Sequence, residues 1–380
     1  MKIAMVLGDY DAYGGGAERW TDRHARRLIK RGHEIHLFSR RFRGAPDVAI
    51  CHLVPPGGAW GRRRIGFGRQ AEHILRDGQY DVIHDMGDGW FADIIMPHHG
   101  TRKGSLEQNL KLVPPSIRWL RRISYPLIPR YREFHALESR KYDGRPETIY
   151  IAVSQMVREN MHRYHAVPYE KIRVIYNGVN IDRFKPSTDD ALRLNTRQEL
   201  GVGEDETLFL LVAHNFRLKG IESLILSIST MSREGKRVRL LVVGDGNISK
   251  YERMARVIGC HQMVRFVGDQ PDPMTYYHAA DVFMLPTFYD PCSLVVLEAM
   301  ACGLPVITTR RNGVHELMGQ GREGFILADP EDVESLVKYM TVYLDKDARR
   351  VAGDCARILA EAYSMKRNCD EHVDVYEEVI

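Results

Sequence analysis

The segment Asp281–Thr309, DVFMLPTFYDPCSLVVLEAMACGLPVITT, decides the fold. An apolar run, DVFMLP, precedes a helical stretch, and a second apolar run, VITT, follows it. Ser293 is a suitable helix N-cap, and Gly303 is a suitable first residue beyond the helix C-terminus. Because Pro305 prevents continuation, Leu294–Cys302 is predicted to form one short helix. Strand, helix and strand in succession predict a parallel sheet covered by helices.

One charged residue interrupts this helix. The helix is apolar on every face and is therefore expected to be buried, with Glu298 as the exception. An unpaired buried carboxylate is costly, but a carboxylate that accepts hydrogen bonds from the diol of a sugar or ribose is tolerated. The alternative is an internal pair between Glu298 and a lysine or arginine.

The same alternation runs along the whole chain of 380 residues, which is long enough for two domains. Apolar strands are expected at KIAMVL, HEIHLFS, DVIH, DIIM and IYIAV in the first half, and at TLFLLV, RLLVVG, VRFVG, DVFMLP and VITT in the second. The polar stretch PSTDDALRLNTRQ follows KIRVIYNGVNIDRFKP and marks the junction. We expect an α/β protein with two doubly wound Rossmann-like domains, 1–176 and 177–363, facing each other across a ligand-binding cleft.

Composition excludes several classes of protein. A hydrophobic content of 44% with 27% charged residues is that of an ordinary globular protein. The six cysteines are scattered without zinc spacing, which favours reduced thiols in the cytoplasm. The N-terminus does not read as a signal peptide, and no run approaches the roughly 18 apolar residues of a membrane span. Neither a metal nor a nucleic-acid partner is expected.

Positive charge is concentrated in the N-terminal third, although the net charge is only +4. The basic stretches are RRFRG at 40–44, GRRRIGFGRQ at 61–70 and the segment 102–134, which also carries Trp119 and Tyr125. They predict an anionic partner, with a solvated basic face as the alternative. Segment 102–134 suits docking on an anionic membrane face or, alternatively, is a helical insert packed on the first domain. The run Arg62–Arg64 is a candidate contact for acceptor phosphates.

Candidate binding residues follow the predicted strands of the second half. Arg217 and Lys219 lie beside a helix N-terminus and form a potential phosphate clamp, the alternative being two solvated cations. Asp290 lies just before the Glu298 helix. The unpaired amides of that helix, those of Ser293, Leu294 and Val295, offer a second phosphate contact.

The first half offers weaker candidates. The glycine loop GGGAER, Gly14–Arg19, permits close approach of the backbone to phosphate or sugar. His98 and His99 end a predicted strand, where a structural role is the alternative to a role beside a reacting sugar. Asp9 and Asp11 imitate a metal-binding Asp-x-Asp motif without a third ligand and are interpreted as polar loop residues.

The ordered series of motifs resembles the retaining glycosyltransferases of family four, which have the GT-B fold. The resemblance rests on YGGGAER, RGHEIHLFSR, PHHGT, VIYNGVNIDRFKP, the LKG of NFRLKG, LLVVGDGN, VRFVGDQ, AADVFMLPTFYDPCSLVVLEAMACGLPVITT and NGVHEL. Within this family the chain looks most like enzymes of lipopolysaccharide core assembly. The resemblance also implies that the last helix, 364–380, packs back on the first domain.

The resemblance assigns roles to individual residues. It implies that Glu298 holds the ribose hydroxyls of the nucleotide, that Asp290 contacts the donor sugar, and that Lys219 and Arg217 contact the diphosphate. It further implies roles near the donor and acceptor for Gly15, Gly16 and His99, and a place for Val267 in the base pocket. The family usually has glutamate where this chain has Asp290, which leaves the donor sugar open.

The implied activity is the retaining transfer of a hexose from a nucleotide-diphosphate sugar, expected to be a UDP-sugar. The acceptor is expected to be a sugar hydroxyl of a glycan or glycolipid, with a phosphorylated acceptor and the lipopolysaccharide core among the candidates. No cofactor is expected, and the chain is placed in the cytoplasm, peripherally on the inner face of the cytoplasmic membrane. The alternatives are a nucleotide-sugar epimerase of the same fold and a nucleotide-binding protein without catalysis. A dehydrogenase is disfavoured, because neither half has a complete dinucleotide glycine signature.

Overall fold

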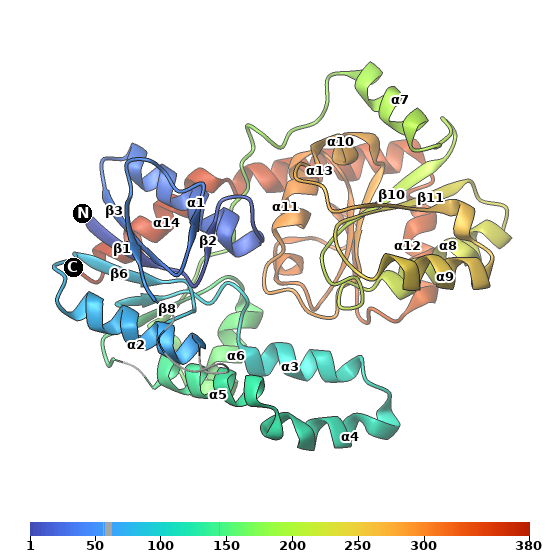
Figure 1. Ribbon diagram of the computed structural model, residues 1–380. Helices are drawn as coiled ribbons and strands as arrows, with labels where there is room; N and C mark the ends of the chain where they lie inside the picture. Colours follow the sequence, from blue (N-terminus) through green and yellow to red (C-terminus); the bar gives the residue numbers. More distant parts are fainter. Residues whose placement is uncertain (56, 58–62, 144) are drawn as a thin grey trace. The chain divides into compact units, whose positions relative to one another are not determined.

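The computed structural model describes all residues except 56, 58–62 and 144. The chain divides into two compact units, Met1–Tyr176 with Lys366–Ile380 and Asn177–Met365. Each unit is built on its own parallel sheet with helices packed against it (Figure 1). The predicted fold class, two doubly wound Rossmann-like sheets, is therefore confirmed.

The N-terminal unit has a seven-stranded parallel sheet in the order β5-β3-β1-β6-β7-β8-β9. β1 lies in the interior of this sheet between β3 and β6, with Ile3 paired to both Ile35 and Val82 and fully buried. The strands are β1 (Lys2–Val6), β3 (Glu34–Ser39), β5 (Ile50–Leu53), β6 (Val82–Asp85), β7 (Ile94–Ile95), β8 (Ile149–Ala152) and β9 (Ile172–Val174), beside a separate pair β2 (Tyr10–Asp11) and β4 (Phe42–Arg43). The helices packed with this sheet are α1 (Gly16–Lys30), α2 (Arg63–Arg76), α6 (Gln155–His165) and α14 (Met365–Glu377), with a short 3-10 turn η2 (Tyr169–Lys171).

Between β7 and β8 the chain forms a layer of helices, α3 (Arg102–Lys111), α4 (Pro115–Ser124), η1 (Tyr125–Leu127) and α5 (Pro129–Tyr142). α5 buries Phe134 and Leu137, whereas α4 buries none of its residues. α5 thus packs on the unit, as the helical-insert alternative expects, while α4 presents its side chains to solvent, and docking of this segment on a membrane stays a prediction.

The C-terminal unit has a six-stranded parallel sheet in the order β12-β11-β10-β13-β14-β15. The strands are β10 (Thr207–Val212), β11 (Val238–Val243), β12 (Val264–Gly268), β13 (Val282–Leu285), β14 (Val306–Thr309) and β15 (Gly324–Leu327). The helices are α7 (Asp190–Glu199), α8 (Ile221–Arg233), α9 (Ile248–Ile258), α10 (Met274–Ala279), α11 (Leu294–Ala301), α12 (Val333–Val342) and α13 (Lys346–Ala362), with 3-10 turns η3 (His261–Met263) and η4 (Gly313–Leu317).

The helix predicted at Leu294–Cys302 is α11, Leu294–Ala301. It is one residue shorter than predicted, and Gly303 follows it with φ 79°, a left-handed conformation suited to glycine. Ser293 occupies the N-cap position, but its side chain accepts no hydrogen bond from the helix. The predicted N-cap position of Ser293 is therefore confirmed, although its buried side chain does not cap the helix.

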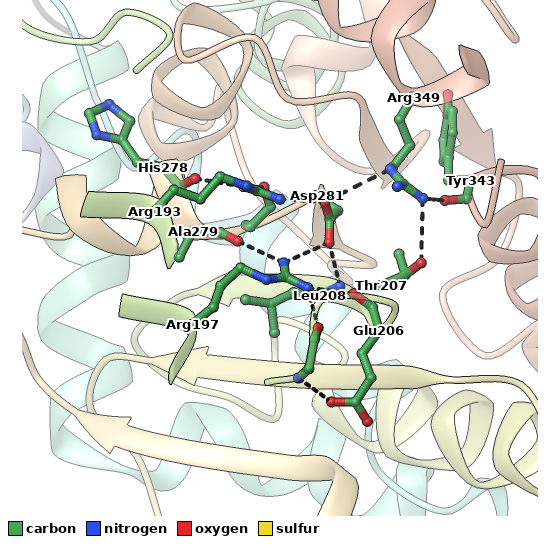
Figure 2. Close-up of polar contacts among 12 residues, drawn as sticks. Arg193, Arg197, Glu206, Thr207, Leu208, His278, Ala279, Asp281, Tyr343 and Arg349 are labelled. Carbon is green, nitrogen blue, oxygen red and sulfur yellow. Dashed lines mark hydrogen bonds and ion pairs between the residues drawn. The ribbon is translucent and has the colours of Figure 1, made fainter. Parts of the chain in front are cut away.

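The polar stretch interpreted as the junction contains α7, a helix that was not predicted. Arg193 and Arg197 of α7 both bind the carboxylate of Asp281, at 2.7 and 3.0 Å (Figure 2). Arg197 also donates to the carbonyl oxygens of Ala279 and Gly203. Because arginines rather than apolar side chains hold α7 in place, its sequence lacks the apolar periodicity of a packed helix.

The C-terminal helix α14 belongs to the N-terminal unit. The Trp20 indole donates to Asn368 Oδ1 at 3.1 Å, and the Tyr376 hydroxyl lies 2.8 Å from both His24 and His84. These contacts tie α14 to α1 and β6. Among the described residues, none of the helices has the length and apolar character needed to span a bilayer.

Candidate active site

The first group of candidate residues lies at the carboxyl edge of the C-terminal sheet. The loop after β10 and the loop after β13 are joined there, since Phe288 N donates to Leu218 O at 2.8 Å. Gly220, at φ 78°, lets these loops approach, because a Cβ at this position would lie 2.0 Å from Pro286 O. This contact brings Lys219 beside Asp290.

Lys219 and Asp290 form an ion pair in which Nζ lies 2.6 Å from Oδ2. Lys219 Nζ also lies 3.4 Å from Tyr289 O. The backbone of Asp290 is fixed in turn by the loop after β14, since its amide donates to Arg311 O and its carbonyl accepts from Gly313 N. Exposed fractions of 18% and 15% leave both side chains accessible to a ligand while restricting their motion.

Glu298 lies one helical turn inside α11 and is 3% exposed. The Tyr277 hydroxyl lies 3.3 Å from its Oε2 and 3.4 Å from Val295 O. Tyr277 belongs to α10 and is fully buried. A tyrosine hydroxyl is thus one partner of the carboxylate, a contact that sequence reasoning did not anticipate.

The amides at the start of α11 are not all available. Ser293 N donates to Asn312 Oδ1 at 3.2 Å, so the expectation that this amide is open to a ligand is wrong. Leu294 and Val295 stay candidates, and both are half-buried. Arg217 is exposed in the same loop as Lys219, and Val267 is half-buried in β12 at the edge of the sheet.

The second group of candidates surrounds a pocket of about 170 Å³ in the N-terminal unit. His99 lines it together with Gly8, Glu18 and Asp88. His99 is partly exposed, and desolvation by the surrounding protein, followed by the charge of Arg102, lowers its pKa.

The glycine loop leads into α1 beside this pocket. Gly15 is the N-cap of α1, and a Cβ added there would lie 2.8 Å from Glu18 Oε2. Gly16, the first residue of α1, is exposed. Burial, followed by the charges of Asp88 and Asp9, raises the pKa of Glu18.

The remaining candidates have structural roles. His98 is 9% exposed and packs on Trp20, with ring centroids 4.5 Å apart. Asp9 pairs with Arg40 at 2.9 Å, and Asp11 accepts a hydrogen bond from Tyr13 N, in keeping with polar loop residues. In the part of the chain that the structure describes, His, Cys, Asp and Glu form no group of three or more suited to a metal.

Sequence reasoning did not single out Asp88, Arg102 or Lys141, which also line the pocket. Asp88 follows β6 closely, and a carboxylate just after a parallel strand is a detectable signal. Lys141 lies near the end of α5, 4% exposed, and no local pattern distinguishes it from a solvated helical lysine. Arg62, named with Arg64 as a phosphate contact, lies outside the described residues.

Two Rossmann-like units with polar residues at the carboxyl edges of their strands define the GT-B class of glycosyltransferases. The chain matches the family description "Glycosyl transferases group 1" over residues 193–357 and "Glycosyltransferase Family 4" over residues 14–183. It is also 31% identical to the D-inositol 3-phosphate glycosyltransferase 2 of Catenulispora acidiphila, over 85% of this chain and 81% of that protein. The chain therefore belongs to the family of glycosyltransferases that these two descriptions name, and the predicted enzyme class, a glycosyltransferase, is confirmed.

Other relatives and structures extend the comparison. The lipopolysaccharide glucosyltransferase WaaG of Escherichia coli is 23% identical over 93% of this chain and 92% of its own length. The chain spans about half the length of the D-inositol 3-phosphate glycosyltransferase of Corynebacterium kroppenstedtii, with 30% identity over 59% of this chain and 51% of that protein. A crystal structure of WaaG matches the fold with a TM-score of 0.82 and 22% identity, over 98% of this chain and 99% of the WaaG chain. The structure of the Anabaena protein Alr3699/HepE in complex with UDP-glucose matches with a TM-score of 0.74 and 18% identity, over 100% of both chains.

Proposed function

We propose that this glycosyltransferase transfers a hexose from a UDP-sugar to a sugar hydroxyl of a glycan or glycolipid, with retention at the anomeric carbon. The observation that carries the proposal is the ion pair of Lys219, from the loop after β10, with Asp290, which precedes the helix of the buried Glu298 after β13. UDP as the nucleotide is supported by the neighbouring fold of Alr3699/HepE, which was crystallised with UDP-glucose.

Each residue has a defined part in the proposed reaction. Glu298 binds the ribose diol, Asp290 the donor sugar, and Lys219 with Arg217 the diphosphate, aided by the amides of Leu294 and Val295. The bond between the anomeric carbon and the β-phosphate oxygen breaks, and the acceptor oxygen bonds to that carbon on the same face. The acceptor proton passes to the departing diphosphate, whose growing negative charge Lys219 and Arg217 stabilise without a metal. The pair with Asp290 holds Lys219 in place before the donor arrives.

The direct test is incubation of the purified protein with UDP-, GDP- and ADP-sugars, with and without oligosaccharide and lipid-linked acceptors. Sugar transfer that requires an acceptor, with retained anomeric configuration by NMR, is the expected result. Turnover of the nucleotide-sugar without any acceptor indicates the epimerase alternative. Nucleotide binding without turnover of any donor indicates a protein that has lost catalysis.

The acceptor class is proposed on two grounds. The WaaG relative is named a lipopolysaccharide glucosyltransferase, which supports a lipopolysaccharide core acceptor. Several relatives are named D-inositol 3-phosphate glycosyltransferases, which supports a phosphorylated acceptor instead. Assays with core oligosaccharide and with inositol 3-phosphate distinguish the two.

We further propose that α4 docks this enzyme on the anionic inner face of the cytoplasmic membrane. Its apolar residues, Ile117, Trp119, Leu120 and Ile123, are all exposed, and Leu127 of η1 is 76% exposed. Arg118, Arg121 and Arg122 lie among them, and α4 contacts mainly α3 and η1 in the helical layer (Figure 1). A helix with exposed apolar residues and interspersed arginines matches an anionic bilayer surface in both polarity and charge.

Flotation with vesicles of anionic phospholipid tests this docking. Binding is expected to weaken with salt and to be lost in Ile123→Glu, whose site is 63% exposed on α4. Ile358→Glu places the same change at a 67% exposed site on α13 and is expected to bind like the unaltered protein. Salt-insensitive binding, equal loss in both variants, or vesicle-free self-association that buries α4 would each overturn the proposal.

A further inference from the structure

Two helices of the N-terminal unit begin with cations rather than acids. Arg64 lies in the first turn of α2, Arg102 is the first residue of α3, and neither first turn contains an acidic residue. The amino end of a helix carries partial positive charge, so that negative groups are favoured there and cations are not. The first turns of these two helices therefore lack a counter-charge of their own.

Helix α5 supplies two glutamates to these helix ends, but both serve the main chain. Glu133 Oε1 accepts from Arg64 N at 2.7 Å, and Glu138 Oε1 accepts from Arg102 N at 2.5 Å. The second oxygen of Glu138 lies 3.6 Å from His165 Nε2. The acids of α5 are thus occupied by backbone amides and by His165 rather than by the two guanidinium groups.

The guanidinium groups instead gather around one buried phenyl ring. Arg102 lies 4.5 Å and Arg64 4.7 Å from the centroid of Phe134, and Arg130 lies at 5.5 Å. Asp88 is 3.8 Å from Arg64, beyond hydrogen-bond distance, and it already accepts from Gly8 N at 2.9 Å. Within the described residues, Arg102 has no carboxylate at ion-pair distance.

Arg64 and Arg102 both line the 170 Å³ pocket, where Lys141 and Arg40 add two further cations. Lys141 is 4% exposed and donates to Gly87 O at 2.6 Å. Of the three acids that line the pocket, Asp9 is bound by Arg40 at 2.9 Å, Asp88 pairs with Arg64 at 3.8 Å and Glu18 adjoins the glycine loop. None of them pairs with Arg102, and a pocket whose cations outnumber its acids favours the binding of an anion.

We propose that this pocket binds a phosphomonoester through the guanidinium groups of Arg64 and Arg102, and that the phosphomonoester is carried by the sugar acceptor. Guanidinium groups suit phosphate because their planar donors match its oxygens in pairs, and packing on Phe134 fixes their planes. The assignment to the acceptor rests on the proposed function, in which the donor diphosphate is bound by Lys219 in the C-terminal unit. The anion site itself does not depend on that function.

Thermal unfolding of the full chain at constant ionic strength tests the site, with inorganic phosphate as the probe. UDP is present in excess so that any diphosphate site is filled. Phosphate is expected to raise Tm in a saturable way, with a half-saturating concentration at least tenfold higher in Arg64→Gln and in Arg102→Gln. Arg132→Gln is the matched control. Arg132 is exposed on α5, the helix that carries Phe134, and this variant is expected to respond like the unaltered protein.

A second measurement needs no variant, in case Arg102→Gln fails to fold. Phosphorus NMR of phosphate with the unaltered protein is expected to show line broadening that glucose 6-phosphate relieves and glucose does not. A phosphate response that persists in both arginine variants, vanishes only in Lys219→Ala, or is relieved equally by glucose would overturn the proposal. A Tm rise with UDP alone reports on the proposed function separately, so that either idea can fail without the other.

Discussion

At the scale of single residues, the most informative side chain is Lys219, because its ion pair with Asp290 positions it. Asp290 lies 2.6 Å from its ammonium group, and the Asp290 backbone is bound on both sides by the loop after β14. A cation held in this way needs little reorganisation when a diphosphate binds. Preorganised charge of this kind is the main source of transition-state stabilisation in reactions with an anionic leaving group.

The change Lys219→Ala is expected to raise the barrier to transfer by about 2–4 kcal/mol, the range for a lost charge-stabilising donor. The measurement is the rate of UDP release at saturating donor and acceptor. Asp290→Asn is the companion variant, because it keeps the ammonium group but removes its counter-charge. Normal turnover in Lys219→Ala, with unchanged Tm, would show that the lysine does not contact the leaving group.

A second prediction concerns the backbone of Gly220, the residue after Lys219. Gly220 has φ 78°, and a Cβ there would lie 2.0 Å from Pro286 O, a main-chain atom that cannot yield easily. Gly220→Ala is therefore expected to lose at least about 1–3 kcal/mol of stability from backbone strain and to displace Lys219. Urea unfolding measures the loss. Gly235→Ala, at φ 73° with no atom within 4 Å, carries only the conformational part and is expected to lose less.

At the scale of helices and strands, α7 is held by charge. Arg197 is 5% exposed and joins Asp281 to the carbonyl oxygens of Ala279, Gly203 and Glu206 (Figure 2). Asp281 also accepts from Leu208 N at 2.7 Å, which ties the network to β10. The network therefore links α7 to the central strand of the sheet that positions Lys219.

Loss of Arg197 leaves Asp281 paired with Arg193, but it removes the donor from the carbonyl oxygens of Ala279, Gly203 and Glu206. Because each buried acceptor left unsatisfied costs about 1–3 kcal/mol, Arg197→Met is expected to cost about 3–5 kcal/mol of unfolding free energy. Arg193→Met removes a contact to the same carboxylate from a side chain that is 30% exposed and is expected to cost clearly less. Urea unfolding of both variants measures the two losses of unfolding free energy. Equal losses would show that the burial of Arg197 does not set the size of its contribution.

The contrast between α7 and α11 shows what the sequence could predict. The βαβ unit around Glu298 was predicted nearly to the residue, because its strands are apolar and glycine and proline mark its end. α7 was missed because its buried contacts come from Arg193 and Arg197. β5 was missed because it lies at the sheet edge with exposed residues such as Ile50.

The residues of the candidate site likewise include some that the sequence indicates and some whose contacts only the fold creates. Lys219, Asp290 and Glu298 were found because each follows a strand or interrupts an apolar helix. The use of the Ser293 amide by Asn312 could not be foreseen, since the two residues come from loops that only the folded sheet brings together. The basic character of segment 102–134 was visible, but the gathering of Arg64 and Arg102 around Phe134 depends on the packing of three helices.

At the scale of the whole molecule, the N-terminal unit closes on its last helix through a buried group of imidazoles. His24, His84, His98 and His372 are all buried around Trp20 and Tyr376, and burial is the main cause that lowers the pKa of each. The Tyr376 hydroxyl lies 2.8 Å from both His24 and His84, so it can donate to one ring and accept from the other only while one ring nitrogen is unprotonated. The attachment of α14 therefore depends on neutral histidines.

The free energy of unfolding is consequently expected to fall at acid pH. A histidine with a lowered folded pKa binds fewer protons than in the unfolded chain, so its full contribution is present above about pH 6.5 and is lost as the pH falls below it. For His372, whose pKa burial lowers to about 4, the loss amounts to roughly 3 kcal/mol once the pH is below that value. Buried carboxyl groups oppose this, since burial raises the pKa of Asp85 to about 6 and also raises the pKa of Glu18, Glu138 and Glu371. His99 and His165, whose pKa burial lowers, add to the effect of the four imidazoles.

The measurement is the urea unfolding free energy between pH 7.5 and 4.5. It is expected to fall steadily below pH 6.5, with α14 the first helix to lose amide protection in hydrogen exchange. His372→Gln removes one of the titrating rings while keeping a polar side chain, and it is expected to make the fall shallower by about one proton. His261→Gln, at an exposed position in η3, is the control and should leave the slope unchanged. A free energy that stays level down to pH 5, or an equal change of slope in both variants, would mean that the buried imidazoles do not govern how the C-terminal helix is held.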